Sequence, residues 1–201
     1  MPYDIEMNTE IPKIQVLFSK TVESITALQL LSDSKHHEFA REWANNMYDI
    51  LSNESMHLLH LISNMNLQGL EFLEFILENK IYHDVDKLIN TILDYDEIEF
   101  IYKTTGEKLN YDEIITLKND KSKFSLLKKN KPWLVRGNFE VIEFIIYETV
   151  NFKRQLANLL KEINNNFIIA SRAYFLQSPT CTRFNNLDYT VMILTPMESW
   201  C

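Results

Sequence analysis

The sequence contains very little glycine and almost no cysteine. Only three of its 201 residues are glycines, so few tight turns with positive φ can form, and helices are favoured over a series of short strands. The two cysteines, Cys181 and Cys201, both lie near the C-terminus, at a spacing that gives neither a zinc-binding pattern nor a disulfide framework. Because apolar residues make up 46% of the chain, we expect a mainly α, multi-helix domain with an ordinary hydrophobic core.

Long apolar runs and a basic net charge are also missing. No run approaches the roughly 18 apolar residues that a membrane span needs, and the acidic N-terminus has no apolar signal-peptide core. We therefore expect a cytoplasmic protein without a membrane partner. The formal net charge is −8, so the overall field of the chain does not attract nucleic acid.

Helical spacing of apolar residues is the main pattern that is present. It predicts helices over residues 20–33, 34–52, 53–65, 67–79, 83–102 and 139–166. A short strand is expected at 13–19, and helices are expected to break within 103–138, which contains two glycines and a proline. The long segment 139–166 carries enough apolar surface to be a dimer-forming helix.

The predicted helices come with expected caps and apolar faces. Asp33 or Ser34 is the expected N-cap of the second helix, and Ser52 or Asn53 that of the third. One side of the fourth helix is expected to carry Leu70, Leu73 and Leu77.

The last part of the chain differs in composition from the rest. From Phe167 onward charged residues become rare, while threonine and β-branched residues increase. We therefore divide the chain into a helical domain, 1–166, and an atypical tail, 167–201, which is expected to be irregular or β-like. Two interpretations stay open: a poorly charged hairpin that packs on the helices, or a shifted reading frame that was never selected to fold with them.

Histidines are the first candidates for chemistry. His36 and His37 are adjacent, so on a helix they would point about 100° apart and could not easily bind one metal. His57 and His60 are three residues apart and share a helical face, which is compatible with two metal ligands. The sequence has no HExxH pattern and no cysteine nearby, so surface or capping histidines are the simpler interpretation, and we expect no metal or cofactor.

Other catalytic patterns are weak. There is no GxSxG for a serine nucleophile, and the isolated Gly106 gives neither a phosphate loop nor a dinucleotide fingerprint. The carboxylates between Asp94 and Glu99 resemble a solvated acidic edge. We therefore expect a protein that is not an enzyme.

A lysine-rich segment raises the question of nucleic-acid binding. Six lysines lie between Lys118 and Lys131, interleaved with the apolar residues Phe124, Leu126 and Leu127. Phosphate contact would need these lysines on one face. A solvated helix and loop is the simpler interpretation, followed by an acidic partner or an acidic surface of the same protein.

The region from about residue 14 to 51 carries a more specific pattern. A short segment ends in a Phe-Ser pair, a helix with a Val-Glu start follows, and a "D..HH…REW" segment comes next. The matching positions are Phe18, Ser19, Val22, Glu23, Leu28, Asp33, His36, His37, Arg41, Glu42 and Trp43. The pattern resembles the N-terminal region of a group of bacterial regulators in the ArsR-like winged-helix superfamily.

The resemblance implies a regulatory domain of a transcription regulator, usually dimeric. In that group a helical segment precedes a winged helix-turn-helix, which binds DNA. After Asn166 no such motif is recognisable, and only Arg172 and Arg183 are basic. We therefore expect a homodimer with a possible small-molecule effector, which meets DNA only through a module not evident in this chain.

Two other functions stay open beside the regulatory one. The first is a stand-alone helical protein that holds a small apolar ligand between its helices, because methionine and phenylalanine are frequent. The second is a metal-dependent protein that uses His57 and His60.

Within the family-like pattern we expect structural roles. Trp43 is predicted to anchor the second helix in the core. Glu23 and Arg41 are predicted to form an ion pair between helices, which would contribute at most about 1 kcal/mol if exposed.

Overall fold

The computed structural model describes residues 19–177, without the side chains of Phe39 and of residues 167–177. In this part of the chain helices follow one another and no strand forms; one isolated bridge joins Met65 and Val135. The predicted mainly α fold is therefore confirmed. Residues 13–18 of the expected N-terminal strand, including Phe18, and the end of the tail from residue 178 lie outside the described residues; Ser19 is the N-cap of the first helix.

The described part of the chain forms the following α-helices, given in chain order. They are α1 Lys20–Ser32, α2 Arg41–Tyr48, α3 Asn53–Ile62, α4 Leu73–Asn79, α5 Val85–Asp94, α6 Glu97–Thr104, α7 Tyr111–Asn119, α8 Phe124–Asn130, α9 Glu140–Tyr147 and α10 Thr149–Gln177. Short 3₁₀ turns connect them: η1 Ser34–His36, η2 Glu38–Ala40, η3 Leu70–Phe72, η4 Lys121–Lys123 and η5 Pro132–Leu134.

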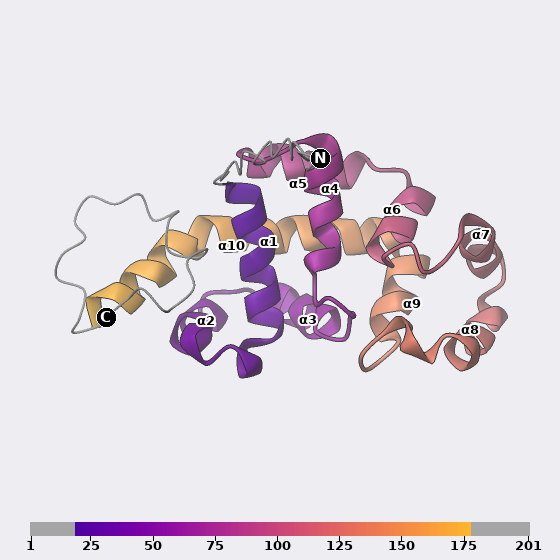
Figure 1. Cartoon of the computed structure of the whole chain (residues 1–201), viewed down its shortest axis with the longest axis horizontal. Helices are drawn as coiled ribbons and strands as arrows, with labels where there is room; N and C mark the ends of the chain where they lie inside the picture. The colour runs from indigo at the N-terminus through magenta and orange to yellow at the C-terminus, as the bar shows by residue number, and fades with distance from the viewer. Residues whose placement is uncertain (1–18, 178–201) are drawn as a thin grey trace, which may run out of the picture.

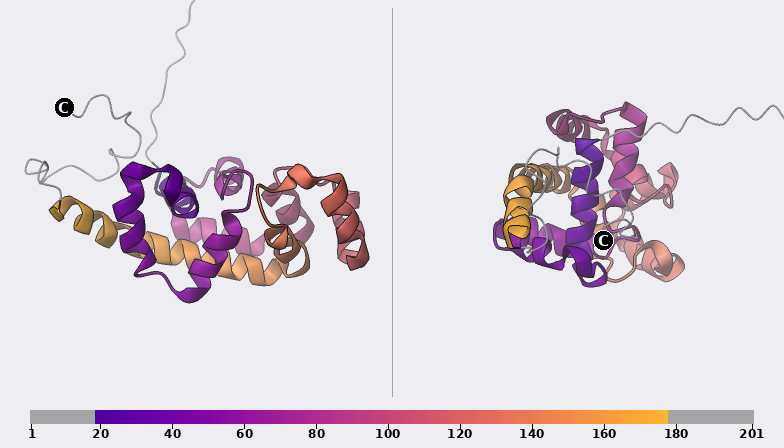
Figure 2. Two further views of the ribbon diagram at one scale, coloured as in Figure 1. Left: turned by 90° about the horizontal axis from the view of Figure 1, so that it is seen from below. Right: turned by 60° about the vertical axis from the view of Figure 1, so that its left-hand side comes forward.

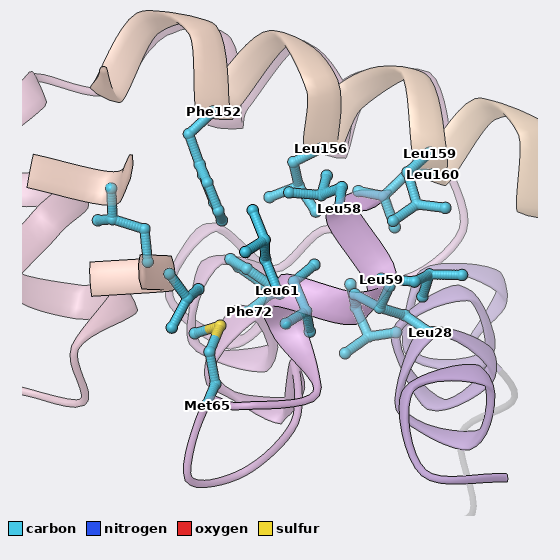
Figure 3. Close-up of a cluster of buried hydrophobic side chains, with 14 of the residues drawn as sticks. Leu28, Leu58, Leu59, Leu61, Met65, Phe72, Phe152, Leu156, Leu159 and Leu160 are labelled. Carbon is cyan, nitrogen blue, oxygen red and sulfur yellow. The ribbon is translucent and has the colours of Figure 1, made fainter. Parts of the chain in front are cut away.

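Helix α10 is the element around which the others pack. It contacts α1, α2, α3, α5, α6 and α9, and it runs along most of the length of the molecule (Figures 1 and 2). One side of α10 carries the buried residues Phe152, Leu156, Leu159, Leu160 and Ile163, none of which is exposed. Figure 3 shows Phe152, Leu156, Leu159 and Leu160 of this row facing leucines of α1 and α3. The apolar surface considered for dimerisation is thus buried within one chain, so a dimer would need other residues.

A single continuous helix is predicted over 34–52, but the structure does not form one. The backbone of His37 is non-helical, with φ −120° and ψ 73°, and α2 begins only at Arg41. The expected cap is also wrong, because the Asp33 carboxylate accepts a hydrogen bond from the ring of His36 instead of a helix amide. His36 and His37 therefore do not lie on an α-helix, and the argument from a 100° separation does not apply to them.

The predicted helix 83–102 is two helices, because two side chains stabilise a break after Asp94. Asp96 caps α6 by accepting hydrogen bonds from the amides of Ile98 and Glu99, at 2.8 and 3.2 Å. Lys153 of α10 donates to the carbonyl of Tyr95, at 2.6 Å. An aspartate favours a helix start, and the lysine satisfies a carbonyl at the end of α5.

The long helix expected at 139–166 is also divided, at Glu148, whose φ and ψ are −125° and 39°. The hydroxyl of Thr149 donates to the carbonyl of Ile145, at 2.8 Å, which caps the end of α9. Beyond the break, α10 continues to Gln177. The first part of the tail, expected to be irregular or β-like, is therefore helical.

The predicted face of the fourth helix is right only in part, because Leu70 and Leu73 pack against the core but Leu77 does not. Leu77 is 60% exposed, while Phe72, Phe75 and Ile76 are fully buried. The chain enters α4 through Gly69, at φ 99°, and the turn η3. A 3₁₀ turn has fewer residues per turn than an α-helix, so a single α-helical period counted from Leu70 does not place Leu77 correctly.

Ser52 offers a direct test of the helix-cap interpretation. Its hydroxyl accepts a hydrogen bond from the amide of Ser55, at 3.2 Å, and donates to Glu162 of α10, at 2.8 Å. Replacing Ser52 by alanine should lower the free energy of unfolding by about 1 kcal/mol, measured by urea denaturation. The exposed Ser125 of α8 is the control, where the same change should cost less than about 0.5 kcal/mol. Equal effects would contradict the cap.

Candidate functional site

The histidines proposed as metal ligands are both exposed on α3. His57 lines a cleft described below, and His60 is not among the residues that line it. Within residues 19–177 no three His, Cys, Asp or Glu side chains come close enough to hold a metal ion. The described part of the chain therefore gives no geometric support to a metal site at His57 and His60.

The acidic residue of the family-like pattern, Asp33, links three parts of the fold. It bonds to His36 in the next turn, and its other oxygen lies 3.7 Å from the guanidinium of Arg136. Burial alone would raise the pKa of the Asp33 carboxyl, but hydrogen bonds with His36 and Gln68 and the charge of Arg136 hold it below its ordinary value. These contacts connect the end of α1 to two loops that are distant in sequence, at Gln68 and Arg136.

The other residues of the pattern divide between core and surface. Trp43 is 8% exposed and belongs to the hydrophobic core, as predicted. The predicted ion pair of Glu23 with Arg41 is wrong, because Arg41 is exposed and lies 3.5 Å from Glu38, one turn away. Burial raises the pKa of Glu23.

The strongest candidate site is a cleft where α3, η4, α9 and α10 meet. We call it the Tyr147 cleft; its volume is about 430 Å³, within the usual range for small-ligand sites. Its lining consists of His57, Leu61, Lys121, Glu140, Glu143, Phe144, Tyr147, Glu148 and Gln155. The break between α9 and α10 creates this site, because it places the last turn of α9 beside the first turns of α10 (Figure 1).

Two polar atoms at the Tyr147 cleft are buried without a hydrogen-bond partner. They are the hydroxyl oxygen of Tyr147 and the side-chain oxygen Oε1 of Gln155. Most buried polar atoms in folded proteins are paired, because an unpaired one costs free energy. Both atoms have almost no solvent-accessible surface, so a ligand in the open cleft would reach them only if the lining side chains moved.

The charges around the Tyr147 cleft are mainly negative. Glu140, Glu143 and Glu148 outnumber the single lysine, Lys121, whose ammonium lies 3.2 Å from Glu143. The same ammonium lies 4.9 Å from the centre of the Tyr147 ring. Burial, followed by the nearby charges of Glu143 and Asp120, raises the pKa of the Tyr147 hydroxyl, so this group stays neutral at ordinary pH.

A second hollow, of about 510 Å³, lies on the other side of Tyr147 and Glu148. Its polar groups are already paired: Arg154 donates to Asn151 at 2.7 Å, and Asn151 donates to Glu148 at 3.1 Å. The Tyr147 cleft shares Tyr147 and Glu148 with this hollow and is also lined by His57, Lys121 and Gln155.

Several lysines of the basic segment are already engaged within the fold. Lys118 pairs with Glu97, and Lys131 lies 2.7 Å from Glu113. Together with the pairing of Lys121, this reduces the positive charge that the segment presents to solvent. The geometry supports the interpretation of a folded helix and loop better than that of a phosphate-binding face.

Sequence reasoning identified His57 but missed Tyr147 and Gln155. Both had been placed in one continuous helix, where no pattern distinguishes them from ordinary interface residues. The break at Glu148 brings them to a cleft, and a threonine after a glutamate is too common a pair to reveal such a break.

None of the helices in residues 19–177 has the length and apolar character needed to cross a membrane. No protein-family model, curated protein or solved structure matches the chain. The similarity to ArsR-like regulators therefore stays a prediction from the sequence pattern.

Proposed function

We propose that this chain is the helical regulatory domain of a bacterial transcription regulator and that it senses a small molecule in the Tyr147 cleft. The observation that carries the sensing role is the cleft itself, a hollow of about 430 Å³ that is lined by a phenol, an amide, three carboxylates and an ammonium. The regulator role rests on the sequence pattern from Phe18 to Trp43. Binding would act on the junction of α9 and α10, and α10 contacts most other helices, so the ligand could favour one arrangement of the domain.

A binding role is proposed in preference to catalysis. Of the described residues that line the cleft, none is a serine, threonine or cysteine, which are the usual hydroxyl and thiol nucleophiles. The cleft offers a phenol, an amide, carboxylates and an ammonium, which can hold a ligand by hydrogen bonds and charge. The charged lining also favours a polar ligand over the small apolar ligand of the stand-alone alternative.

Thermal-shift screening tests the sensing role. A ligand at 100 times its Kd stabilises the folded state by about 2.7 kcal/mol, which for a chain of this length raises Tm by roughly 5–10 °C. We expect at least one compound to stabilise the wild-type chain and to lose this effect in the variant Tyr147→Phe/Gln155→Leu. Ligands that stabilise both proteins equally, or a screen in which no stabilisation depends on these residues, would refute sensing at this cleft.

The regulator role is tested by the nucleotide sequence downstream of codon 167, and by the oligomeric state and DNA binding of the purified chain. A winged-helix reading frame in another phase downstream of codon 167 would support it, and stop codons in every phase there would count against it. We propose a homodimer that does not bind DNA by itself. Sedimentation equilibrium should give twice the chain mass, and a DNA mobility shift should be absent.

A further inference from the structure

The Tyr147 cleft also indicates the chemical class of its ligand. We propose, building on the sensing role above, that the cleft binds a small organic ammonium ion with an apolar body, and that the side chain of Lys121 itself occupies the ammonium position.

Lys121 shows how the cleft receives a positive charge. Its ammonium lies 3.2 Å from a carboxylate oxygen of Glu143 and 4.9 Å from the centre of the Tyr147 ring. A carboxylate beside an aromatic face is the usual protein environment for an organic ammonium, since both attract the cation. A ligand ammonium would meet the same two groups.

The contacts of Lys121 leave it displaceable. Its side chain is 69% exposed, and an ion pair this open to solvent contributes little to stability. Leaving the cleft would return its ammonium to water at small cost. The Lys121 side chain therefore competes with a ligand for the position beside Glu143 and the Tyr147 ring, and a ligand ammonium can displace it.

The remaining groups of the cleft select against other ligand classes. An ammonium has three donors and no acceptor, which suits the carboxylates of Glu140 and Glu148 that line the cleft beside Glu143. An anionic ligand of the same size would be repelled by these carboxylates. Phe144 supplies an apolar contact for the body of the ligand.

Three probes of similar size separate the effect of ligand charge on affinity from that of ligand size. They are 2-phenylethylammonium, neutral 2-phenylethanol and anionic phenylacetate. Binding is measured by isothermal titration calorimetry at pH 7, where only the first is a cation. We expect the ammonium probe to bind, and each of the other two to bind at least about 10-fold more weakly, as one charge-assisted contact predicts.

Variants of the two pairing residues test the role of Lys121. Lys121→Ala removes the competitor and should tighten binding of 2-phenylethylammonium by about 3- to 10-fold, whereas Glu143→Gln should weaken it by about 10-fold or more. Lys123→Ala, an exposed lysine that does not line the cleft, is the matched control and should change the affinity by less than about 2-fold. Melting curves of all three variants should overlay that of the wild type.

Three outcomes would overturn the ligand class: no binding of the ammonium probe at millimolar concentration, equal or tighter binding of the alcohol or the carboxylate, or weaker binding to Lys121→Ala. Such a result leaves the proposed function standing if the thermal-shift screen finds a neutral or anionic ligand that depends on Tyr147 and Gln155. The absence of any such ligand refutes the sensing role as well.

Discussion

Replacing Phe152 by alanine is expected to lower the free energy of unfolding by about 3–5 kcal/mol. The side chain is fully buried near the N-terminal end of α10. Its ring centre lies 6.4 Å from that of Phe72, 6.1 Å from that of Phe100 and 5.5 Å from that of Phe144. Removing the ring creates a cavity among side chains from four helical segments, which cannot all move inward to fill it.

Thermal and urea denaturation measure this effect. For a chain of this length each kcal/mol shifts Tm by about 2–4 °C, so Phe152→Ala should reduce Tm by roughly 6–20 °C. Val150 is the matched control, because it lies on the same helix two residues earlier and is 66% exposed. Val150→Ala should change the stability by less than about 0.5 kcal/mol. A small shift for Phe152→Ala would mean that α10 does not pack as described.

Replacing Lys103 by methionine is expected to destabilise the fold by about 2–4 kcal/mol, less than a fully buried pair because its partners are partly solvated. The Lys103 side chain is 7% exposed, and its ammonium lies 2.5 Å from Glu78, 3.2 Å from Glu74 and 3.7 Å from Glu99. Methionine preserves much of the packing but leaves three glutamates facing one another. The exposed Lys87 of α5 is the control, and Lys87→Met should have little effect.

The pH dependence of this effect follows from the pKa shifts. The hydrogen bond from Lys103 holds the pKa of Glu78 below its ordinary value. Its stabilising contribution is present above about pH 4.3, the unfolded value, and is lost as pH falls through the lower folded pKa. Burial alone would lower the pKa of Lys103, but hydrogen bonds to Glu78 and Glu74 raise it. The contribution of Lys103 is therefore complete below about pH 10.4 and is lost only as pH rises through the higher folded pKa.

Urea denaturation at pH 7 and pH 3 tests this coupling. The difference in unfolding free energy between wild type and Lys103→Met should be largest near pH 7 and should narrow at pH 3, as the pH falls toward the lowered pKa of Glu78. A difference that is the same at both pH values would show that the loss comes from packing and not from the charges.

The helical fold could be predicted from the sequence because the apolar spacing is strong. The rows through Leu28 in α1 and through Leu59 in α3 are buried as expected, and Ser52 caps α3 by an ordinary side-chain hydrogen bond. Some predictions failed because of local features, such as the turn η3 before α4, and one failed in part because of a contact distant in sequence. The helix break at Tyr95 depends on Lys153, 58 residues later, and no local pattern contains that information.

The candidate site was predictable only in fragments. The adjacent histidines suggested a metal or catalytic site, but His36 contacts Asp33, which also pairs with Arg136. His57 does reach the Tyr147 cleft, together with groups that no motif connects to it. A site formed where two helices meet at a break depends on tertiary packing, so its residues carry no fixed spacing along the chain.

The central position of α10 also constrains the order of folding. Its buried row contacts α1, α2 and α3, which are separated from it by most of the described sequence. During synthesis these early helices emerge first, and α1 can pack against α3, α4 and α5, but the faces that contact α10 stay uncovered until α10 leaves the ribosome. We infer that the core closes late, in a step of long loop closure, which is slow compared with the formation of neighbouring helix pairs. The nascent chain would therefore expose apolar surface for much of its synthesis, the condition under which chaperones bind.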